Sequence, residues 1–265
     1  MNIDIHNHLL WDLDDGPGTV DETIRMAMTA VKQGITHVIA TPHYRKDRYE
    51  PEPEVVKEKV LHLNQLLQRE EIPLLISAGN EIHLYPEIVD DLLTGENVLT
   101  LNDTKKYVLI ELPNHHLPMY TEQIFFDMQL HGFIPILAHP ERNTEFRRDP
   151  TKLATLVQKG ALVQISARSL LFKGHHNMKK FTNLLIKHNL VHLVASDAHD
   201  TENRPFLLQN AFAYINKKHN HSYSTFYNNN ARNVLNGIAF HIHPPLLFKK
   251  KLSLLKESNH AYKNS

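Results

Sequence analysis

The chain has 265 residues, of which 42% are hydrophobic and 22% are charged, and its 29 basic side chains balance its 29 acidic ones. This length suits a single α/β barrel or two smaller domains, and the zero net charge argues against a protein that grips nucleic acid or an anionic membrane through its overall field. The absence of cysteine excludes disulfides, thiolate metal sites and every mechanism with a cysteine nucleophile, whereas the twenty histidines are compatible with transition-metal binding.

The beginning of the chain carries no targeting signal that we recognise. Its first residues lack the basic start and the apolar stretch of a signal peptide. No apolar run approaches the roughly 18 residues that are needed to span a bilayer. We therefore expect a cytoplasmic protein with no stable membrane insertion and no nucleic-acid partner.

Short apolar runs recur along the chain with helical patterns between them. The runs are rich in Val, Ile and Leu, which is typical of parallel strands that are buried on both faces. Seven strands are expected, at residues 3–8, 35–40, 74–78, 107–112, 133–138, 161–165 and 191–195. Thr19 and Glu22 form a capping box at the start of the first helix, and Gly34 stands where that helix should stop. Further helices are predicted at residues 51–71, 122–131, 150–159, 178–188 and 205–218.

The regular alternation of strand and helix is the rhythm of a parallel α/β sheet, and closure into a barrel is the favoured form. No Gly/Ser-rich linker divides the chain. The last residues differ in composition, because residues 241–265 contain five lysines and one glutamate and so carry a net charge of +4. We expect a basic, partly disordered tail, with contact to an acidic partner or a membrane surface as the alternative.

Polar motifs follow five of the seven predicted strands. In parallel α/β architectures the active site lies at the carboxyl ends of the strands. The motifs are His6-Asn7-His8, Thr41-Pro42-His43, Gly79-Asn80-Glu81, His139-Pro140-Glu141-Arg142 and Ser196-Asp197-Ala198-His199. Residues i and i+2 of an extended segment point the same way, so the first and the last motif can each chelate an ion.

Nitrogen and carboxylate ligands without sulfur favour Mn, Fe, Zn or Mg. With one acidic residue from the loop after the first strand, the candidate ligands are His6, His8, Asp15, His43, Glu81, His139, Asp197 and His199. This set exceeds the four ligands of one tetrahedral ion, so we expect two or three divalent ions. Such clusters lower the pKa of a bridging water and neutralise phosphoryl oxygens. Asp14 competes with Asp15, because either could bind the metal while the other caps the turn at Gly16.

Together with Asp14-Asp15-Gly16-Pro17, these motifs resemble the PHP (polymerase and histidinol phosphatase) superfamily of metal-dependent phosphoesterases. They are most similar to its bacterial protein-tyrosine phosphatases of capsule and exopolysaccharide gene clusters. The resemblance covers residues 1–240 and leaves out the tail, residues 241–265. It implies a distorted, TIM-like (β/α)7 barrel in a single domain, with a three-metal centre that often holds manganese.

The resemblance also implies a role for each candidate residue. His6, His8, Glu81 and Asp197 would hold the first ion, Glu81 would bridge to a second ion bound by His139, and Asp15, favoured here over Asp14, would hold the third with His43 and His199. Arg142 and Arg204 match arginines that bind the phosphate, and a guanidinium fork fits phosphate oxygens. For Glu81 and Asp197 the alternative role is helix capping, and for the two arginines it is a surface ion pair.

The resulting hypothesis is a metal-dependent protein-tyrosine phosphatase, a phosphoric monoester hydrolase whose substrate, by family analogy, is a tyrosine autokinase that controls polysaccharide export. His43, His199 and a metal-bound water are the candidates for the general acid. Arg45 would line the mouth and meet an acidic peptide. The alternatives are histidinol phosphate or another small phosphomonoester as substrate, a nuclease, and a non-catalytic binding module that keeps the metal for stability.

Overall fold

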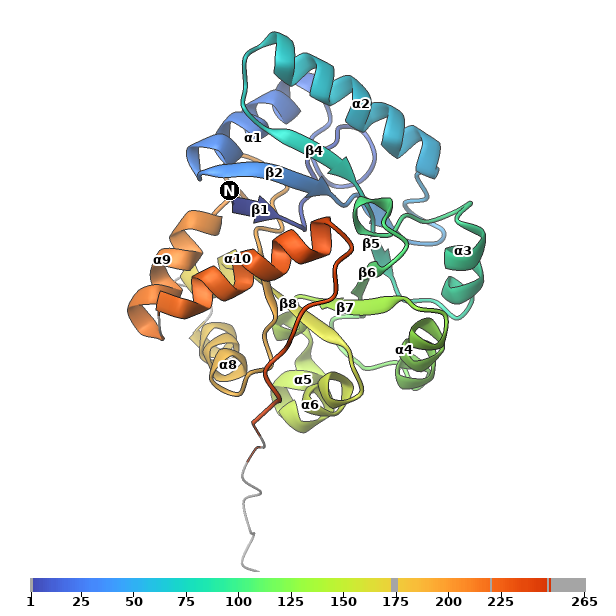
Figure 1. Cartoon of the computed structure of the whole chain (residues 1–265), viewed down its shortest axis with the longest axis vertical. Coiled ribbons are helices and arrows are strands. Elements are labelled where there is room, and N and C mark those ends of the chain that lie inside the picture. Colours follow the sequence, from blue (N-terminus) through green and yellow to red (C-terminus); the bar gives the residue numbers. More distant parts are fainter. Residues whose placement is uncertain (1, 173–175, 220, 247, 249–265) are drawn as a thin grey trace, which may run out of the picture.

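The computed structural model of the chain describes residues 2–172, 176–219, 221–246 and 248 (Figure 1). Two parallel sheets form its centre. The first contains β1 (Asn2–Asp4), β2 (Ile35–Ala40) and β4 (Leu75–Ala78). The second contains β3 (His43–Tyr44), β5 (Glu81–His83), β6 (Tyr107–Glu111), β7 (Ile134–Ala138), β8 (Leu162–Ser166) and β9 (Leu193–Ala195).

The two sheets are parts of one barrel. Seven of the nine strands overlap the seven predicted segments, whereas β3 and β5 lie just beyond two of them, because only two residues separate β2 from β3 and β4 from β5. The barrel closes where Asn7 and Ala198 form a parallel bridge, with His8 N donating to Ala198 O at 2.8 Å and Asp197 N to His6 O at 2.8 Å. The predicted single-domain, TIM-like barrel with seven strand segments is confirmed.

Helices surround the barrel. Those that the sequence predicts are α1 (Val20–Lys32), α2 (Pro53–Arg69), α4 (Thr121–Leu130), α6 (Pro150–Gln158), α8 (His176–Lys187) and α9 (Leu208–Lys218). The predicted capping box is confirmed, because Thr19 accepts from Glu22 N while the Glu22 side chain accepts from Thr19 N. Gly34, just beyond α1, adopts a φ of 69°, which costs glycine little.

Four helices were not predicted: α3 (Ile88–Thr94), α5 (Thr144–Arg148), α7 (Ala167–Leu171) and α10 (His221–Leu235). The first three have only five to seven residues, too few to display a helical period. The longest, α10, has a mainly polar sequence with three consecutive asparagines. Its apolar face becomes clear only where it packs.

Helix α10 covers the amino-terminal end of the barrel (Figure 1). Ala231 and Val234 belong to the same buried cluster as the barrel-interior residues Ile3 and Tyr107. Asn230 Nδ2 donates to the carbonyl oxygen of His192, at the start of the last strand, at 2.8 Å. A second, larger cluster lies between the barrel and its outer helices. These two clusters bury the strands on both faces, and the carboxyl ends of the strands lie opposite α10.

The first part of the basic tail lies against the barrel domain, beside the end of α8. Leu246 N donates to His188 O at 2.8 Å, and the Phe248 ring stacks on the His188 ring with centroids 4.1 Å apart. All five tail lysines lie outside the described residues, so the basic, partly disordered tail stays a prediction. Within the described part of the chain, none of the helices combines the length and apolar character that crossing a bilayer requires.

His192 makes the stability of the fold dependent on pH. Its ring is buried, and Nδ1 accepts from Val163 N at 3.0 Å. Burial lowers the pKa of His192 from 6.5 to about 4. Between these values the unfolded chain binds more protons than the native one, so stability falls as the pH drops through this window.

We expect the wild type to lose about 3 kcal/mol more of its free energy of unfolding than a His192→Asn variant between pH 6.5 and pH 4. Asparagine keeps an acceptor for Val163 N and does not titrate. Urea unfolding of both proteins in the presence of a chelator, at each pH, measures this difference. The same pH dependence in both proteins would contradict the assignment.

Candidate metal centre

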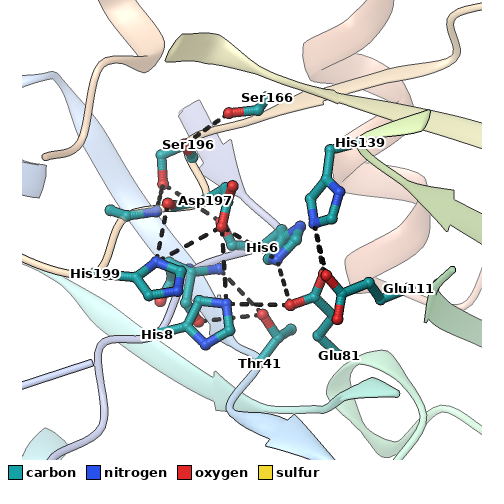
Figure 2. Close-up of polar contacts among 12 residues, drawn as sticks. His6, His8, Thr41, Glu81, Glu111, His139, Ser166, Ser196, Asp197 and His199 are labelled. Atoms are coloured by element: carbon teal, nitrogen blue, oxygen red, sulfur yellow. Dashed lines mark hydrogen bonds and ion pairs between the residues drawn. The ribbon is translucent and has the colours of Figure 1, made fainter. Parts of the chain in front are cut away.

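The eight predicted ligands converge at the carboxyl ends of the strands. Figure 2 labels six of them: His6, His8, Glu81, His139, Asp197 and His199. The secondary structure explains the convergence. His43 and Glu81 begin β3 and β5, which two residues separate from the ends of β2 and β4, and the other six ligands lie in loops that follow strands. His6 and His8 follow β1, His139 follows β7, and Asp197 and His199 follow β9. The register of β3 and β5 sets His43 directly opposite Glu81. Asp15 reaches the same place from the loop between β1 and α1.

The Glu81 carboxylate lies at the middle of the cluster. Its Oε2 is 3.2 Å from His6 Nε2, 3.3 Å from His8 Nε2 and 3.1 Å from His43 Nδ1. Its Oε1 is 2.8 Å from His139 Nε2. The Glu81 side chain is 1% exposed. One buried carboxylate therefore contacts four imidazoles, which suits it to bridge two cations.

Asp197 forms a second negative centre. Its Oδ1 lies 3.7 Å from His6 Nε2 and 3.6 Å from His199 Nδ1. Arg204 Nη2 donates to the same oxygen at 2.8 Å, and Arg142 Nη2 donates to Oδ2. Burial opposes ionisation of Asp197, yet Arg142, His6 and Arg204 outweigh it and hold its pKa well below the usual range. Both arginines thus pair with a buried carboxylate of the cluster.

Two of these residues have strained backbones. His139 has a φ of 28° and Asp197 a φ of 55°, in the left-handed region that side chains other than glycine avoid. Such conformations persist only where the surroundings enforce them, and they gather at functional sites. Here they aim both side chains at the cluster.

The structure shows that Asp14 and Asp15 make different contacts. Asp15 Oδ1 lies 3.4 Å from His43 Nε2 and 3.3 Å from His199 Nε2. Asp14 Oδ2 lies 2.6 Å from His8 Nδ1, which is the ring nitrogen opposite the Nε2 that faces Glu81. The same oxygen accepts a hydrogen bond from His43 N at 2.8 Å. Asp15 therefore belongs to the cluster, while Asp14 orients its members.

The turn after Asp14 needs a glycine. Asp14 Oδ1 accepts from Gly16 N at 2.9 Å, which fixes the turn. A Cβ atom at Gly16 would lie 2.3 Å from His8 O. The backbone of this turn can approach His8 only because Gly16 has no side chain.

Buried polar atoms without partners face the middle of the cluster. Among the described residues, His6 Nε2, His8 Nε2, His199 Nε2 and Glu81 Oε2 are buried and lie 3.2–3.3 Å from an oppositely polarised atom of the cluster, yet none of them forms a hydrogen bond. Buried polar atoms are normally satisfied, so four such atoms at one place require an explanation. The opposite ring nitrogens are held, for example His6 Nδ1 by Gln164 Oε1 at 2.9 Å. This arrangement fits metal ligands, whose outer nitrogens bond to the protein.

Sequence analysis missed Glu111. It ends β6, and its carboxylate oxygens lie 3.9 Å from His139 Nε2 and 4.0 Å from His43 Nδ1. Burial raises the pKa of Glu111 to about 7, and the neighbouring Glu81 carboxylate adds to the rise. His43, Glu81 and Glu111 bring three ligand atoms within 4.8 Å of one another. The strand-end rule that selected the other residues applies equally to this one.

Protons compete with cations at this site. Burial disfavours the charged form of His6 and His43, yet the Glu81 carboxylate outweighs it and raises the pKa of each to about 9. Burial lowers the pKa of His139 and of His199 to about 4. A cation must displace the protons on His6 and His43, so its binding releases protons and weakens in acid.

A pocket of about 220 Å³ opens over the cluster. Arg142 and Arg204 line it, and so does Arg45, which is exposed at the rim beside Arg48. The Tyr49 ring, also in the lining, lies parallel to the His43 ring with centroids 5.9 Å apart. The pocket therefore combines guanidinium groups with the buried carboxylates of the cluster. Tyr49 adds an aromatic ring to its lining, and in the segment after His43 the sequence predicts a role for Arg45 alone.

We expect Asp14→Asn to weaken metal binding about 10- to 100-fold, because it removes the charged partner of His8 Nδ1. Calorimetric titration of the chelator-treated protein with Mn²⁺ measures the affinity. Asp12→Asn is the matched control, since Asp12 lies in the same loop but is exposed. Equal affinities in both variants would show that Asp14 has no orienting role.

Comparison with known proteins identifies the family. Residues 2–236 match the CpsB/CapC family of capsular polysaccharide synthesis. The chain belongs to the CpsB/CapC family. The tyrosine-protein phosphatase YwqE of Bacillus subtilis is 43% identical over 249 residues, which cover 94% of this CpsB/CapC chain and 97% of that protein. The tyrosine-protein phosphatase CpsB of Streptococcus pneumoniae is 30% identical over 222 residues, with coverages of 82% and 90%.

Solved structures agree with the assignment to the CpsB/CapC family. One, from crystallographic work on Bacillus subtilis YwqE and Streptococcus pneumoniae CpsB as metal-dependent tyrosine phosphatases, superposes with a TM-score of 0.90 at 43% identity. It covers 94% of this chain and 100% of that chain. A histidinol phosphate phosphatase from Lactococcus lactis, solved with zinc, L-histidinol and phosphate, has a TM-score of 0.50 at 13% identity, a likeness of fold alone.

Proposed function

We propose that the protein is a metal-dependent tyrosine-protein phosphatase that hydrolyses phosphotyrosine in a protein substrate. The observation that carries this proposal is the set of buried, unpartnered ligand atoms beneath a pocket that Arg142 and Arg204 line. The family relatives YwqE and CpsB, which are named tyrosine-protein phosphatases, support the choice of phosphotyrosine. The chain has no cysteine, so its chemistry differs from that of cysteine-dependent phosphatases.

The proposed ligand sets follow the contacts within the cluster. His6, His8, Glu81 and Asp197 would hold a first ion, and Glu81 with His139 a second. Glu111 adds a carboxylate to the second set, and Asp15, His43 and His199 make the third. Two or three divalent ions fit this number of donors, and their nitrogen and oxygen atoms suit Mn²⁺, with Fe, Zn or Mg as the other candidates.

When bound, these ions would supply an activated water near neutral pH and would neutralise charge on the phosphoryl group. Arg142 and Arg204 would hold the nonbridging phosphate oxygens, for which their planar forks are suited. The leaving phenolate of tyrosine has a pKa near 10, so it departs more readily than an alkoxide. His43 and His199, the two histidines proposed as proton donors, are also assigned to the third ligand set, so either could donate a proton only while that set holds no ion. His43 is the more accessible of the two, with 16% of its side chain exposed against 3% for His199.

The proposed biological role is the control of polysaccharide synthesis. The family description, capsular polysaccharide synthesis, supports a substrate in that process. We propose that this substrate is a tyrosine autokinase and that both proteins meet in the cytoplasm. Arg45, at the exposed rim of the pocket, would contact the acidic residues around the phosphotyrosine.

The test compares substrates with the metal-loaded full chain. We expect a phosphotyrosine peptide to be hydrolysed with a much higher kcat/KM than histidinol phosphate or an oligonucleotide. A clear preference for histidinol phosphate would replace the proposal with a small-molecule phosphatase. Binding of metal without hydrolysis of any phosphomonoester, including p-nitrophenyl phosphate, would replace it with a non-catalytic module.

A further inference from the structure

A basic groove lies between α5, α8 and α9, outside the candidate metal centre. Its volume is about 920 Å³. Six cationic side chains line it: Arg147, Arg148, Lys179, Lys180, Lys187 and Lys218. No acidic side chain is part of the lining. Figure 1 shows α8 beside α5 and α6, so the groove runs over the outer helical layer of the barrel. We call it the basic groove.

The positive charge of the basic groove is uncompensated. Across the described ranges, none of its six cations forms an ion pair with an acidic side chain. Arg147 donates to two backbone carbonyl oxygens, and Lys179 lies over the Tyr214 ring, 4.5 Å from its centroid. The whole chain has no net charge, so this concentration is local. It would attract an anionic ligand from solution.

The basic groove is connected to the catalytic pocket. Arg147 Nη1 donates to the carbonyl oxygen of Arg142 at 2.5 Å, so the first cation of the groove supports the backbone of an arginine in the pocket. A small hollow of about 230 Å³ shares Arg142 and Arg204 with the catalytic pocket and is also lined by Arg168 and Met178. Met178 immediately precedes Lys179 on α8. The hollow therefore extends the catalytic pocket as far as a residue that is adjacent in sequence to the groove.

We propose that the basic groove binds an acidic segment of the phosphoprotein substrate while its phosphotyrosine occupies the catalytic pocket. This inference rests on the proposed function. The groove is concave, and the exposed polar side chains of His176 and Asn177 line it beside the six cations, which suits an extended peptide. An anionic bilayer is the rival partner, because clustered lysines and arginines attract anionic headgroups, but the concave shape of the groove favours an extended peptide over a planar surface.

The groove would act mainly on substrate capture. Exposed charges accelerate encounter and strengthen binding, and salt screens both effects. The KM for a phosphotyrosine peptide should therefore depend on acidic residues outside the catalytic pocket and on ionic strength. The turnover number and the hydrolysis of p-nitrophenyl phosphate, which is too small to reach the groove, should not.

The test uses two double variants of the full chain with the same change in net charge. Lys180→Glu/Lys187→Glu reverses two exposed cations of the groove. Arg69→Glu/Lys217→Glu reverses two exposed cations outside the lining, on α2 and α9. Each protein is assayed with p-nitrophenyl phosphate and with two phosphotyrosine peptides, one flanked by a run of glutamates and the other by glutamines.

We expect the groove variant to raise KM for the glutamate peptide about tenfold, with the glutamine peptide, p-nitrophenyl phosphate and the control variant changed less than about twofold. Equal KM values for both peptides in the wild type, or equal effects of both double variants, would overturn the proposal. Fluorescence anisotropy of a labelled, unphosphorylated glutamate peptide tests the groove without catalysis, so it separates a failure here from a failure of the proposed phosphatase activity.

The same binding assay distinguishes other anionic partners. The wild type and the groove variant are titrated with phosphatidylglycerol vesicles and with a labelled oligonucleotide. We expect weak binding of both, little changed by the substitutions. A loss of vesicle or oligonucleotide binding in the groove variant, with unchanged binding of the glutamate peptide, would assign the groove to that partner instead.

Discussion

Glu81→Gln is expected to lower kcat for phosphotyrosine hydrolysis by about a thousandfold and to reduce the bound metal. Glu81 contacts four imidazoles and would bridge two ions. Glutamine has nearly the same shape but offers one neutral carbonyl oxygen, so it cannot bridge with a negative charge. The Lewis acid contribution of such ions is several kcal/mol, and each 1.4 kcal/mol changes the rate about tenfold.

Metal content by atomic emission and kcat by a phosphate-release assay test this prediction together. Glu87→Gln is the control, because Glu87 is exposed and its one ion pair among the described residues is with Lys46. Circular dichroism verifies that the Glu81→Gln protein is folded. A folded variant with wild-type kcat would show that Glu81 is not part of the catalytic centre.

Arg142→Gln is expected to lower kcat about 100- to 1000-fold while the bound metal stays near the wild-type amount. The reason is that Arg142 donates to Asp197 Oδ2, whereas His6 and His199 lie 3.7 and 3.6 Å from Oδ1, and Arg142 also lines the pocket. Its loss leaves Asp197 paired with Arg204. Arg142→Lys keeps the charge but lacks the bidentate fork, so it should recover only part of the rate.

The amount of bound metal distinguishes the Arg142→Gln variant from the Glu81→Gln variant. Arg69→Gln, at an exposed position on α2, controls for the loss of one positive charge. If Arg142→Gln lost its metal as fully as Glu81→Gln, the arginine would serve the structure of the centre. If its kcat/KM stayed at the wild-type value, Arg142 would have no role in phosphate binding.

The sequence predicted the barrel because strands and ligands obey simple local rules. Buried parallel strands are continuous apolar runs, and the functional side chains come directly after them. His6, His43 and Asp197 could therefore be assigned to one rim without coordinates. The same rule applies to Glu111 at the end of β6, and it was overlooked because no histidine motif accompanies it.

Other features depend on tertiary contacts that no local pattern encodes. The choice between Asp14 and Asp15 needed the position of the turn, since both carboxylates are adjacent in sequence and both suit either role. The polar helix α10 has little helical signal of its own and is stabilised by packing on the barrel end. The basic groove combines residues from three helices that are distant in the chain.

The most direct measurement is anomalous diffraction from crystals of the full chain grown with Mn²⁺ near neutral pH. We predict two or three peaks inside the cluster, each within about 2.6 Å of imidazole nitrogens and carboxylate oxygens, with Glu81 between two of them. Crystals without any peak among these side chains, or with ions bound only elsewhere, would contradict the central claim that this barrel holds a metal centre for phosphate hydrolysis.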